Sequence, residues 1–290
     1  MNRADSWAYV SGVCAAREAA FFNARFFAEL AALSPVELSN RLSRSFFGPV
    51  EPLASFDPIA RQRRRREFDE IESLCPDRLP VTLLRLRFAG DSIRKALDEV
   101  PDRVAPEELG AIMVRLSLRA SDFAALFAAQ FCGPFEGRGV SARQAASLLV
   151  DSAELLLTLR IAQNSGDLFL VDWARAAVRV GSAKVASRAV AAGVPRQTLD
   201  ELFFRQELLT VEAQEFLAVY VEAAAEWLYP DGATAGGEEA YLLSVCEGFK
   251  AEPFSAARVL GYLAGFLDQE RKLRLAVYTS LGRISREVAA

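Results

Sequence analysis

Residues 169–190 have the sequence FLVDWARAAVRVGSAKVASRAV, in which apolar positions recur with the period of an α-helix. Two segments of similar pattern lie on either side of it: LLRLRFAGDSIRKALDEV at 83–100 and VLGYLAGFLDQERKLRLAVYTSL at 259–281. Self-similarity at a fixed interval is typical of a supersecondary unit that has been copied and packed against its copies. The three segments therefore predict a chain built from three related helical units.

A basic residue near the centre of each segment sets the register of this repeat. Arg94, Lys184 and Arg274 align with one another, and each is separated from the next by 90 residues. An alanine follows each of the three basic residues two positions later. The constant interval indicates that the three basic positions are equivalent in the three units.

The predicted fold class is all-α. No segment shows sustained period-2 alternation with β-branched enrichment, which is the pattern of a half-buried strand. We expect roughly a dozen helices, given an average helix of about 11–12 residues. The interval of 90 residues divides them into three similar lobes, at 1–105, 106–195 and 196–290.

The third segment carries two charges inside an apolar stripe. The stripe consists of Val259, Leu263, Phe266, Leu267, Leu273, Val277 and Leu281. Glu270 and Arg274 project into its middle, one turn apart, in the Glu-before-Arg order that favours an ion pair. Lys184 lies on the apolar side of its helix if that helix continues through Gly181, whereas Arg94 lies beside the stripe of its own segment.

Two interpretations of these four residues remain open. An isolated buried charge costs several kcal/mol, so each must be paired or must face a wet cavity. Arg94, Lys184, Glu270 and Arg274 are therefore either structural ion pairs with snorkelling side chains, or interior polar groups that the three units turn toward a shared interior or a partner-binding surface.

The amino-terminal part has clear helix signals. Residues 6–33 predict one long helix, whose aromatic residues come in two pairs: Phe21, Phe22 and Phe26, Phe27. Such spacing favours core packing, with a groove for a partner as the alternative. Ser34 then predicts an N-cap, with Pro35 in the first turn and Glu37 completing a capping box, and the following helix ends before Gly48.

Five arginines lie within six positions: Arg61, Arg63, Arg64, Arg65 and Arg66. Such a run is able to bind anionic lipid or nucleic acid. The alternative is a solvated helix face, because Glu67, Asp69 and Glu70 follow at positions that allow neutralisation at i,i+4 spacing. The charge balance favours the solvated face.

Composition narrows the protein class. The net charge of −4 and the pI near 5.3 give no global basic footprint for nucleic acid. The four cysteines form no CxxC motif, which suits a reducing compartment. Neither an apolar run of the ~18 residues needed to cross a membrane nor an export signal is apparent. We therefore expect a soluble cytoplasmic protein, or one that reaches a membrane through partners.

Histidine is absent from the chain. Its absence removes Ser-His-Asp and Cys-His nucleophiles and every histidine metal site, while catalysis by carboxylates or lysine remains open. Residues 230–237, PDGATAGG, lack the Gly-Lys-Ser/Thr ending of a phosphate loop and predict an ordinary loop. The sequence thus predicts no cofactor and no metal.

Four groups of residues, in chain order, carry a family resemblance. The first group is Tyr9-Val10 with Ala15-Ala16-Arg17, similar to an opening YxxARVRxxE pattern. The second group runs from Ser34-Pro35 to Phe47-Gly48. The third group is Leu168-Phe169-Leu170 with Ser182-Ala183-Lys184. The fourth group comprises 252–263, 269–274 and 282–286. Over nearly the full length, these groups resemble the C/d subunit family of V-type and archaeal A-type ATPases.

The resemblance implies both a fold and a function. It implies a funnel of three helical lobes related by pseudo-threefold symmetry, placed between the central rotor stalk and the membrane rotor ring. The protein would be peripheral on the cytoplasmic face, would bind stalk and ring subunits, would not bind nucleic acid, and would couple the rotor to the ring without catalysis of its own. The chain departs from the family pattern at Ser92, Ser182, Ala89, Arg179 and Thr279-Ser280.

Two other classes of function remain as alternatives. A divergent paralogue would act as an all-helical scaffold or regulatory adaptor outside any ATPase. An enzyme would use carboxylates such as Asp167, Asp172 or Glu270, although no pair of them converges with a nucleophile. An operon of ATPase stalk and membrane subunits around the gene would favour the coupling function.

Overall fold

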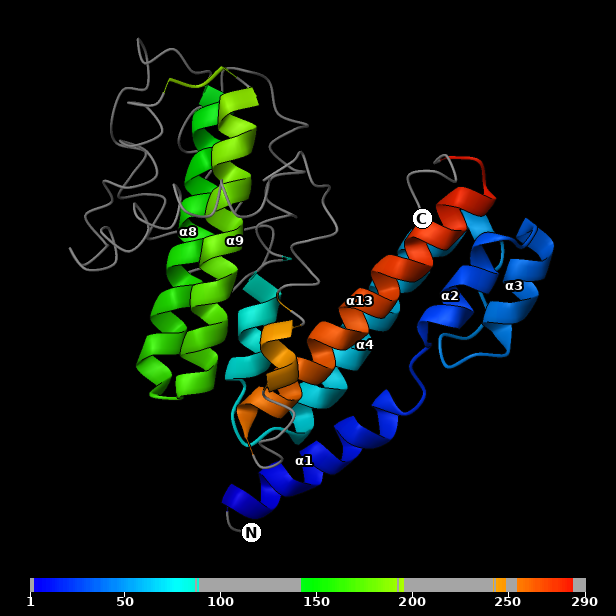
Figure 1. The fold of residues 1–290 in the computed structure, drawn as a ribbon. Coiled ribbons are helices and arrows are strands. Elements are labelled where there is room, and N and C mark those ends of the chain that lie inside the picture. The colour runs from blue at the N-terminus through cyan, green and yellow to red at the C-terminus, as the bar shows by residue number, and fades with distance from the viewer. Residues whose placement is uncertain are drawn as a thin grey trace. The chain divides into compact units, whose positions relative to one another are not determined.

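The computed structural model describes residues 3–86, 88, 142–191, 193–195, 242, 244–248 and 255–283. Within these ranges the chain is mostly helical and has no β-strand, which confirms the all-α prediction for them. The elements are α1 (Arg3–Glu18), α2 (Ala24–Ala31), α3 (Pro35–Ser43), the 3-10 helix η1 (Leu53–Ser55), α4 (Phe56–Leu74), α8 (Ala142–Ser165), α9 (Leu168–Ala191) and α13 (Ala256–Ser280) (Figure 1). Residues 79–86 and 244–248 are helical as well.

The chain divides into two compact units. Unit 1 contains Met1–Val81 together with Leu243–Ala290, and unit 2 contains Thr82–Leu242. Unit 1 therefore joins the two ends of the chain. The three-lobe arrangement stays a prediction, because Arg94 and most of its predicted helix lie outside the described residues.

Helix α13 is the central element of unit 1. It packs against α1, α2, α3 and α4 (Figure 1). The apolar stripe predicted for it supplies much of its contact surface: Val259, Leu263, Phe266, Leu273 and Val277 are buried. Tertiary packing of such a face, more than helix propensity, stabilises a helix of this kind.

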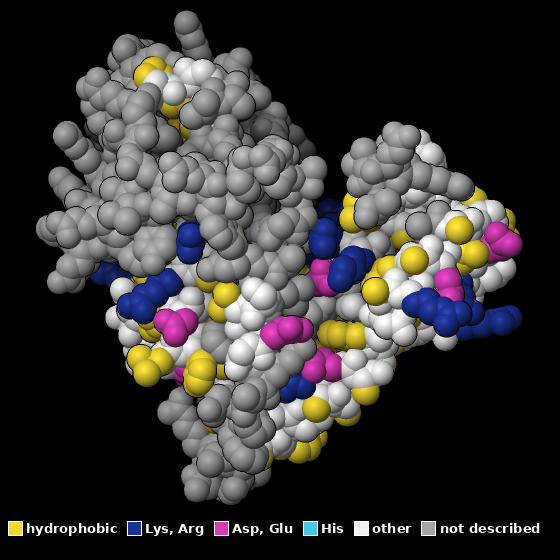
Figure 2. All heavy atoms as spheres, viewed as in Figure 1, with side chains coloured by type: hydrophobic (Ala, Val, Ile, Leu, Met, Phe, Trp, Pro, Cys, Tyr) yellow, Lys and Arg dark blue, Asp and Glu magenta, His cyan; other side chains and the backbone are white. Residues whose placement is uncertain are grey.

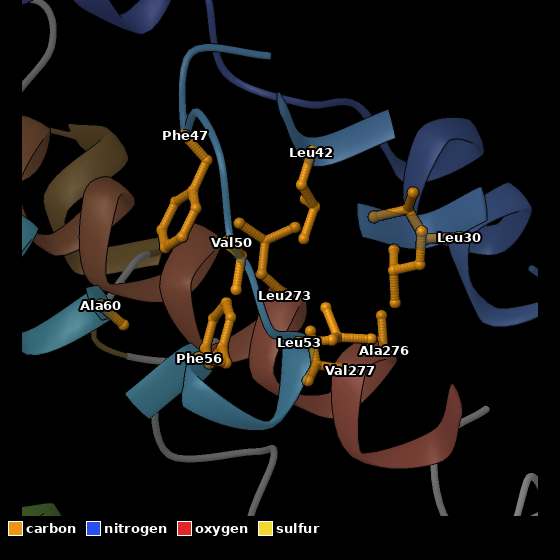
Figure 3. Packing of buried hydrophobic residues seen from close by; sticks show 11 residues of the cluster. Leu30, Leu42, Phe47, Val50, Leu53, Phe56, Ala60, Leu273, Ala276 and Val277 are labelled. Carbon is orange, nitrogen blue, oxygen red and sulfur yellow. The ribbon is translucent and has the colours of Figure 1, made fainter. Parts of the chain in front are cut away.

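One apolar cluster lies between α2, α3, the start of α4 and the carboxyl end of α13. Its buried members are Leu30, Leu38, Leu42, Phe47, Val50, Leu53, Phe56, Ala60, Leu273, Ala276 and Val277 (Figure 3). Full burial of a Leu, Val or Phe side chain contributes about 1.5–3 kcal/mol. Phe22, Phe26 and Phe27 pack against this cluster and are partly buried, which supports core packing for the aromatic pairs.

The single long helix predicted for residues 6–33 is wrong. α1 ends at Glu18, a turn follows, and α2 begins at Ala24. The side chain of Asn23 caps α2 by accepting a hydrogen bond from the backbone N–H of Phe26 at 2.9 Å. Helical periodicity continues through the segment, so the cap, and not the apolar pattern, marks the break.

The signals around α3 are confirmed. Ser34 caps the helix, its side chain and that of Glu37 form the capping box, and Pro35 is the first helical residue. Gly48 then adopts φ +77°, a left-handed conformation that glycine reaches without steric cost.

In unit 2, α8 and α9 form an antiparallel helical hairpin (Figure 1). Gly166 makes the turn at φ +68°, and the Asp167 carboxylate caps α9 by accepting from the N–H groups of Phe169 and Leu170. The predicted continuation through Gly181 is confirmed. A Cβ at this position would lie 2.5 Å from Leu155 Cδ2, so glycine allows α8 and α9 to approach closely.

Candidate functional site

Of the four candidate residues, two lie on the same described helix. Glu270 and Arg274 lie on α13 in unit 1. Lys184 lies on α9 in unit 2, and its side chain is outside the described residues, as is all of Arg94. The geometry that follows therefore concerns Glu270, Arg274 and the residues they contact.

Glu270 and Arg274 belong to a seam of polar contacts along α13. We call this the charged seam: Arg17, Glu18, Asp57, Arg64, Glu67, Arg258, Tyr262, Glu270, Arg274 and Tyr278. Its members come from α1, α4 and α13, so the seam joins the first helix of the chain to the last one described.

Glu270 is the most buried carboxylate of the charged seam, with 3% of its side chain exposed. Its Oε1 accepts hydrogen bonds from Arg274 Nη2 at 2.8 Å and from Arg64 Nη1 at 3.2 Å. The one-turn spacing predicted the contact with Arg274. The contact with Arg64, which lies 206 residues away, could not be predicted from spacing.

Asp57 binds the other side of Arg274. Arg274 Nε donates to Asp57 Oδ1 at 3.0 Å, and the Tyr278 hydroxyl donates to Asp57 Oδ2 at 2.5 Å. Burial raises the pKa of Asp57, but the hydrogen bonds from Tyr278 and Arg274 and the positive charge of Arg274 and Arg61 outweigh it, so the pKa lies below its ordinary value. The hydrogen bond to Asp57 is the main reason that the pKa of Tyr278 is raised.

The amino-terminal half of α13 repeats this pattern against α1 and α4. Arg258 is bound by both carboxylate oxygens of Glu18, with Nη1 donating to Oε1 at 2.9 Å. The Tyr262 hydroxyl donates to Glu67 Oε1 at 2.6 Å, and Arg17 pairs with the same carboxylate. Burial and then the contact with Glu67 raise the pKa of Tyr262.

Gln269 secures the link between α1 and α2. Its side-chain oxygen accepts from the Phe22 N–H at 2.8 Å, and its side-chain nitrogen donates to the Phe22 carbonyl at 3.2 Å. Nearby, the rings of Phe21 and Tyr262 stack with centroids 5.7 Å apart. The turn that replaces the predicted continuous helix is thus held directly on α13.

The chemistry of the seam is that of matched charge pairs. Glu18, Asp57, Glu67 and Glu270 each accept from an arginine. Burial raises the pKa of the neighbouring Cys14 and Cys75 thiols to about 12, which keeps both protonated near neutral pH. Loss of one partner would leave an uncompensated, partly buried charge, so these pairs oppose displacement of the helices that they join.

The two other candidate carboxylates have local partners in unit 2. Asp167 caps α9, and Asp172 accepts from Arg175 at 3.2 Å. In the part of the chain that the structure describes, no three Cys, Asp or Glu side chains gather as a metal-binding group. None of the described helices is both long and apolar enough to cross a membrane.

Sequence reasoning missed several members of the charged seam. Arg258 and Tyr262 precede Glu270 by multiples of four residues, and Tyr278 follows Arg274 by four. This row of polar positions along one helix was a usable signal, because residues four apart lie near one another on its surface. Asp57 and Glu18 carried no such signal, since their partners lie on another helix.

A second surface of unit 1 combines aromatic rings with cations. Arg41 lies over the Phe26 ring at 5.4 Å from its centroid, and Lys272 lies over Phe27 at 5.7 Å. Figure 2 shows hydrophobic side chains beside Lys and Arg side chains over the end of unit 1 that α2 and α3 form. The rings pack on the apolar cluster beneath them, so this surface first of all covers the core.

Comparison with known proteins adds no relative. No protein-family model matches the chain, and no curated protein sequence matches it either.

Proposed function

We propose that the protein is a non-catalytic central-stalk subunit of a V/A-type rotary ATPase, coupling the rotor shaft to the membrane ion-translocating ring. One observation supports the proposal above the others. The two segments that resemble the opening and closing patterns of the C/d subunit family lie against one another in unit 1 and are joined by the charged seam.

Some residues of the resemblance take part in the polar contacts of unit 1. In the opening segment, Arg17 pairs with Glu67 and Glu70. In the closing segment, Glu270 and Arg274 pair with each other. Arg258, in the closing segment, pairs with Glu18, which directly follows the opening motif, and this contact joins the first helix to α13.

A coupling subunit must transmit torque without deforming. α13 has 25 residues, which at 1.5 Å per residue gives a length of about 37 Å. Polar contacts hold it near both ends, at Arg258 and at Tyr278, and apolar packing holds it between them. Removing one partner of a buried charge pair costs about 3–5 kcal/mol, so such pairs oppose displacement of the helices they join, which suits a rigid link.

In this function the partners are the central rotor stalk subunits and the membrane rotor ring, and the protein sits peripherally on the cytoplasmic face. The contacts of the charged seam are internal to unit 1. Binding to stalk and ring would therefore use outer surfaces, while the seam keeps the subunit stiff between them.

Native purification tests the proposal. The chromosomal gene is tagged, membranes are extracted with a mild detergent, and the recovered proteins are quantified by mass spectrometry. We expect stalk and ring subunits of a rotary ATPase in fixed ratio to the tagged chain. An untagged strain and a strain tagged on an unrelated cytoplasmic protein serve as controls. Recovery with partners that include no ATPase subunit would contradict the proposal and favour the scaffold or adaptor function.

A further inference from the structure

The arginine run of α4 divides into an inner and an outer set. Arg63 donates to the Phe46 carbonyl at 3.0 Å and lies over the Phe47 ring, and Arg64 pairs with Glu270. These two arginines are half-buried and bind groups within unit 1. Arg61, Arg65 and Arg66 are exposed, and we call these three the α4 arginine face.

Two of the three acids that follow the run in sequence, Glu67 and Glu70, are bound by side chains of other helices. Glu67 binds Arg17 and the Tyr262 hydroxyl, and Glu70 Oε2 lies 2.8 Å from Arg17 Nη2. Both carboxylates are thus held by other helices. The solvated face that the sequence favoured, balanced at i,i+4 spacing, is present only in part.

None of the three arginines of the α4 arginine face forms an ion pair with any described residue, and the carboxylate of Asp57, on which the charge of Arg61 acts, is already bound by Arg274 and Tyr278. Arg61 and Arg65 lie one turn apart, where like charges repel each other and weaken the helix slightly. Exposed guanidinium groups without an ion-pair partner keep their hydrogen-bond donors available for a carboxylate or a phosphate. The face is therefore a candidate for binding an anionic group.

We propose that the α4 arginine face binds an acidic helix of a protein partner, one that presents carboxylates at one-turn intervals. Arginine recognises a carboxylate through two parallel hydrogen bonds. Two guanidinium groups one turn apart on a helix match two carboxylates one turn apart on a facing helix. The inference rests on α4 alone and holds whether or not the partner is an ATPase subunit.

The surroundings of the face favour a protein helix over a membrane or a nucleic acid. The large hydrophobic side chains exposed in the described residues are Tyr9, Val36 and Leu168, and none of them lies on α4. The α4 arginine face therefore has no large exposed apolar side chain on its own helix to insert into a lipid surface. The net charge of −4 opposes the approach of a long polyanion, whereas a short acidic helix meets mainly the local field.

The test measures binding of the full-length protein to four probes by fluorescence anisotropy or co-sedimentation at 50 mM NaCl. The first probe is a fluorescein-labelled alanine-rich helical peptide with glutamate at every fourth position. The second has the same composition, with the glutamates in one contiguous block. The third is vesicles with 30% phosphatidylserine, and the fourth is a single-stranded DNA of 20 nucleotides.

Three variants identify the surface. The test variant is Arg61→Gln/Arg65→Gln/Arg66→Gln, and the single variant Arg65→Gln guards against a folding defect of the triple. The matched control, Arg25→Gln/Arg44→Gln/Arg175→Gln, removes the same charge from exposed arginines elsewhere. Circular dichroism and the urea midpoint check that each variant folds as the wild type does.

We expect the spaced peptide to bind at least fivefold more tightly than the block peptide. The triple variant should raise its Kd at least tenfold, the single variant about threefold, and the control less than twofold. Equal binding of the two peptides would overturn the proposal, as would equal loss in the test and control variants. Tighter, arginine-dependent binding of vesicles or DNA than of the spaced peptide would overturn it in favour of that ligand.

Discussion

Arg258 of α13 pairs with Glu18 of α1 across 240 residues of sequence, with Nη1 and Nη2 donating to the two oxygens of one carboxylate. Both side chains are mostly buried, at 9% and 18% exposed. The first helix of the chain and the last one described are therefore fixed to each other by a paired charge that neither helix satisfies alone. The same relationship recurs along α13, and the following predictions test it.

The first prediction concerns Glu270 and its two arginines. Glu270→Ala leaves Arg64 and Arg274 without their shared carboxylate and should lower the free energy of unfolding by about 3–5 kcal/mol. Arg274→Ala should cost less, about 1–3 kcal/mol, because 34% of its side chain is exposed. Urea titration of both single variants and the double variant measures the coupling.

The double variant should be destabilised by about 1–3 kcal/mol less than the sum of the singles, because the two residues share one interaction. Glu29→Ala, which removes the carboxylate that pairs with exposed Arg25, is the control and should cost about 0–1 kcal/mol. Strict additivity of the Glu270 and Arg274 effects would show that the buried pair does not stabilise unit 1.

The second prediction concerns acid stability. The folded-state pKa of Asp57 is lowered by Tyr278 and Arg274. A lowered pKa contributes stability that is present above the unfolded value of about 3.9 and is lost as pH falls through the folded value. Asp57→Asn should therefore be less stable than the wild type at pH 7, by about 1 kcal/mol, and the gap should shrink below pH 4. A gap that stays constant from pH 7 to pH 2.5 would contradict this role.

The third prediction concerns the alkaline side. The pKa of Tyr262 is raised by burial and by its hydrogen bond to Glu67. A raised pKa contributes stability that is complete below the unfolded value of about 10 and is lost as pH rises toward the folded value. At pH 7 the free energy of unfolding of Tyr262→Phe should be about 1–3 kcal/mol lower than that of the wild type. Between pH 9 and 11 it should fall less steeply with pH than that of the wild type, because the variant lacks the titrating hydroxyl. Tyr9→Phe, at an exposed position, is the control and should match the wild type throughout.

The fourth prediction concerns Gly48. Its φ of +77° disfavours any side chain, and a Cβ there would lie 2.4 Å from Arg63 Nη2. Gly48→Ala should destabilise the protein by about 1–3 kcal/mol, because it adds backbone strain and displaces Arg63 from the Phe46 carbonyl. Gly12→Ala should instead stabilise the protein by about 0.5–1 kcal/mol, because alanine has the higher helix propensity. Gly12 lies within α1, and no atom lies within 4 Å of the Cβ that alanine would add. Calorimetry measures the unfolding temperature of both variants. An unchanged unfolding temperature for Gly48→Ala would contradict a strained turn at this position.

Local signals in the sequence predicted much of the helical structure. The capping box at Ser34 and the apolar stripe of 259–281 both depend on neighbours within a few residues, and both predictions agree with α3 and α13. The break at Asn23 was missed because apolar residues keep a helical spacing on both sides of it. The capping side chain of Asn23 alone marks the beginning of α2.

The partners of the charged seam could not be predicted in the same way. Glu270 and Arg274 are four residues apart, so helix geometry alone brought them together. Arg64, Asp57 and Glu18 meet α13 only because the chain returns to its beginning after about 200 residues. Contacts of this kind depend on how helices pack, and a repeat of 90 residues carries no information about them.

The coupling function is tested most directly by comparing ATP hydrolysis with ATP-driven ion transport in membrane vesicles. Vesicles from a strain that lacks this gene are measured beside vesicles from the same strain carrying the gene on a plasmid. The proposal predicts that hydrolysis sensitive to rotary-ATPase inhibitors persists without the protein, while ATP-driven ion transport is lost and returns on complementation. Equal ratios of transport to hydrolysis in the two preparations would contradict it.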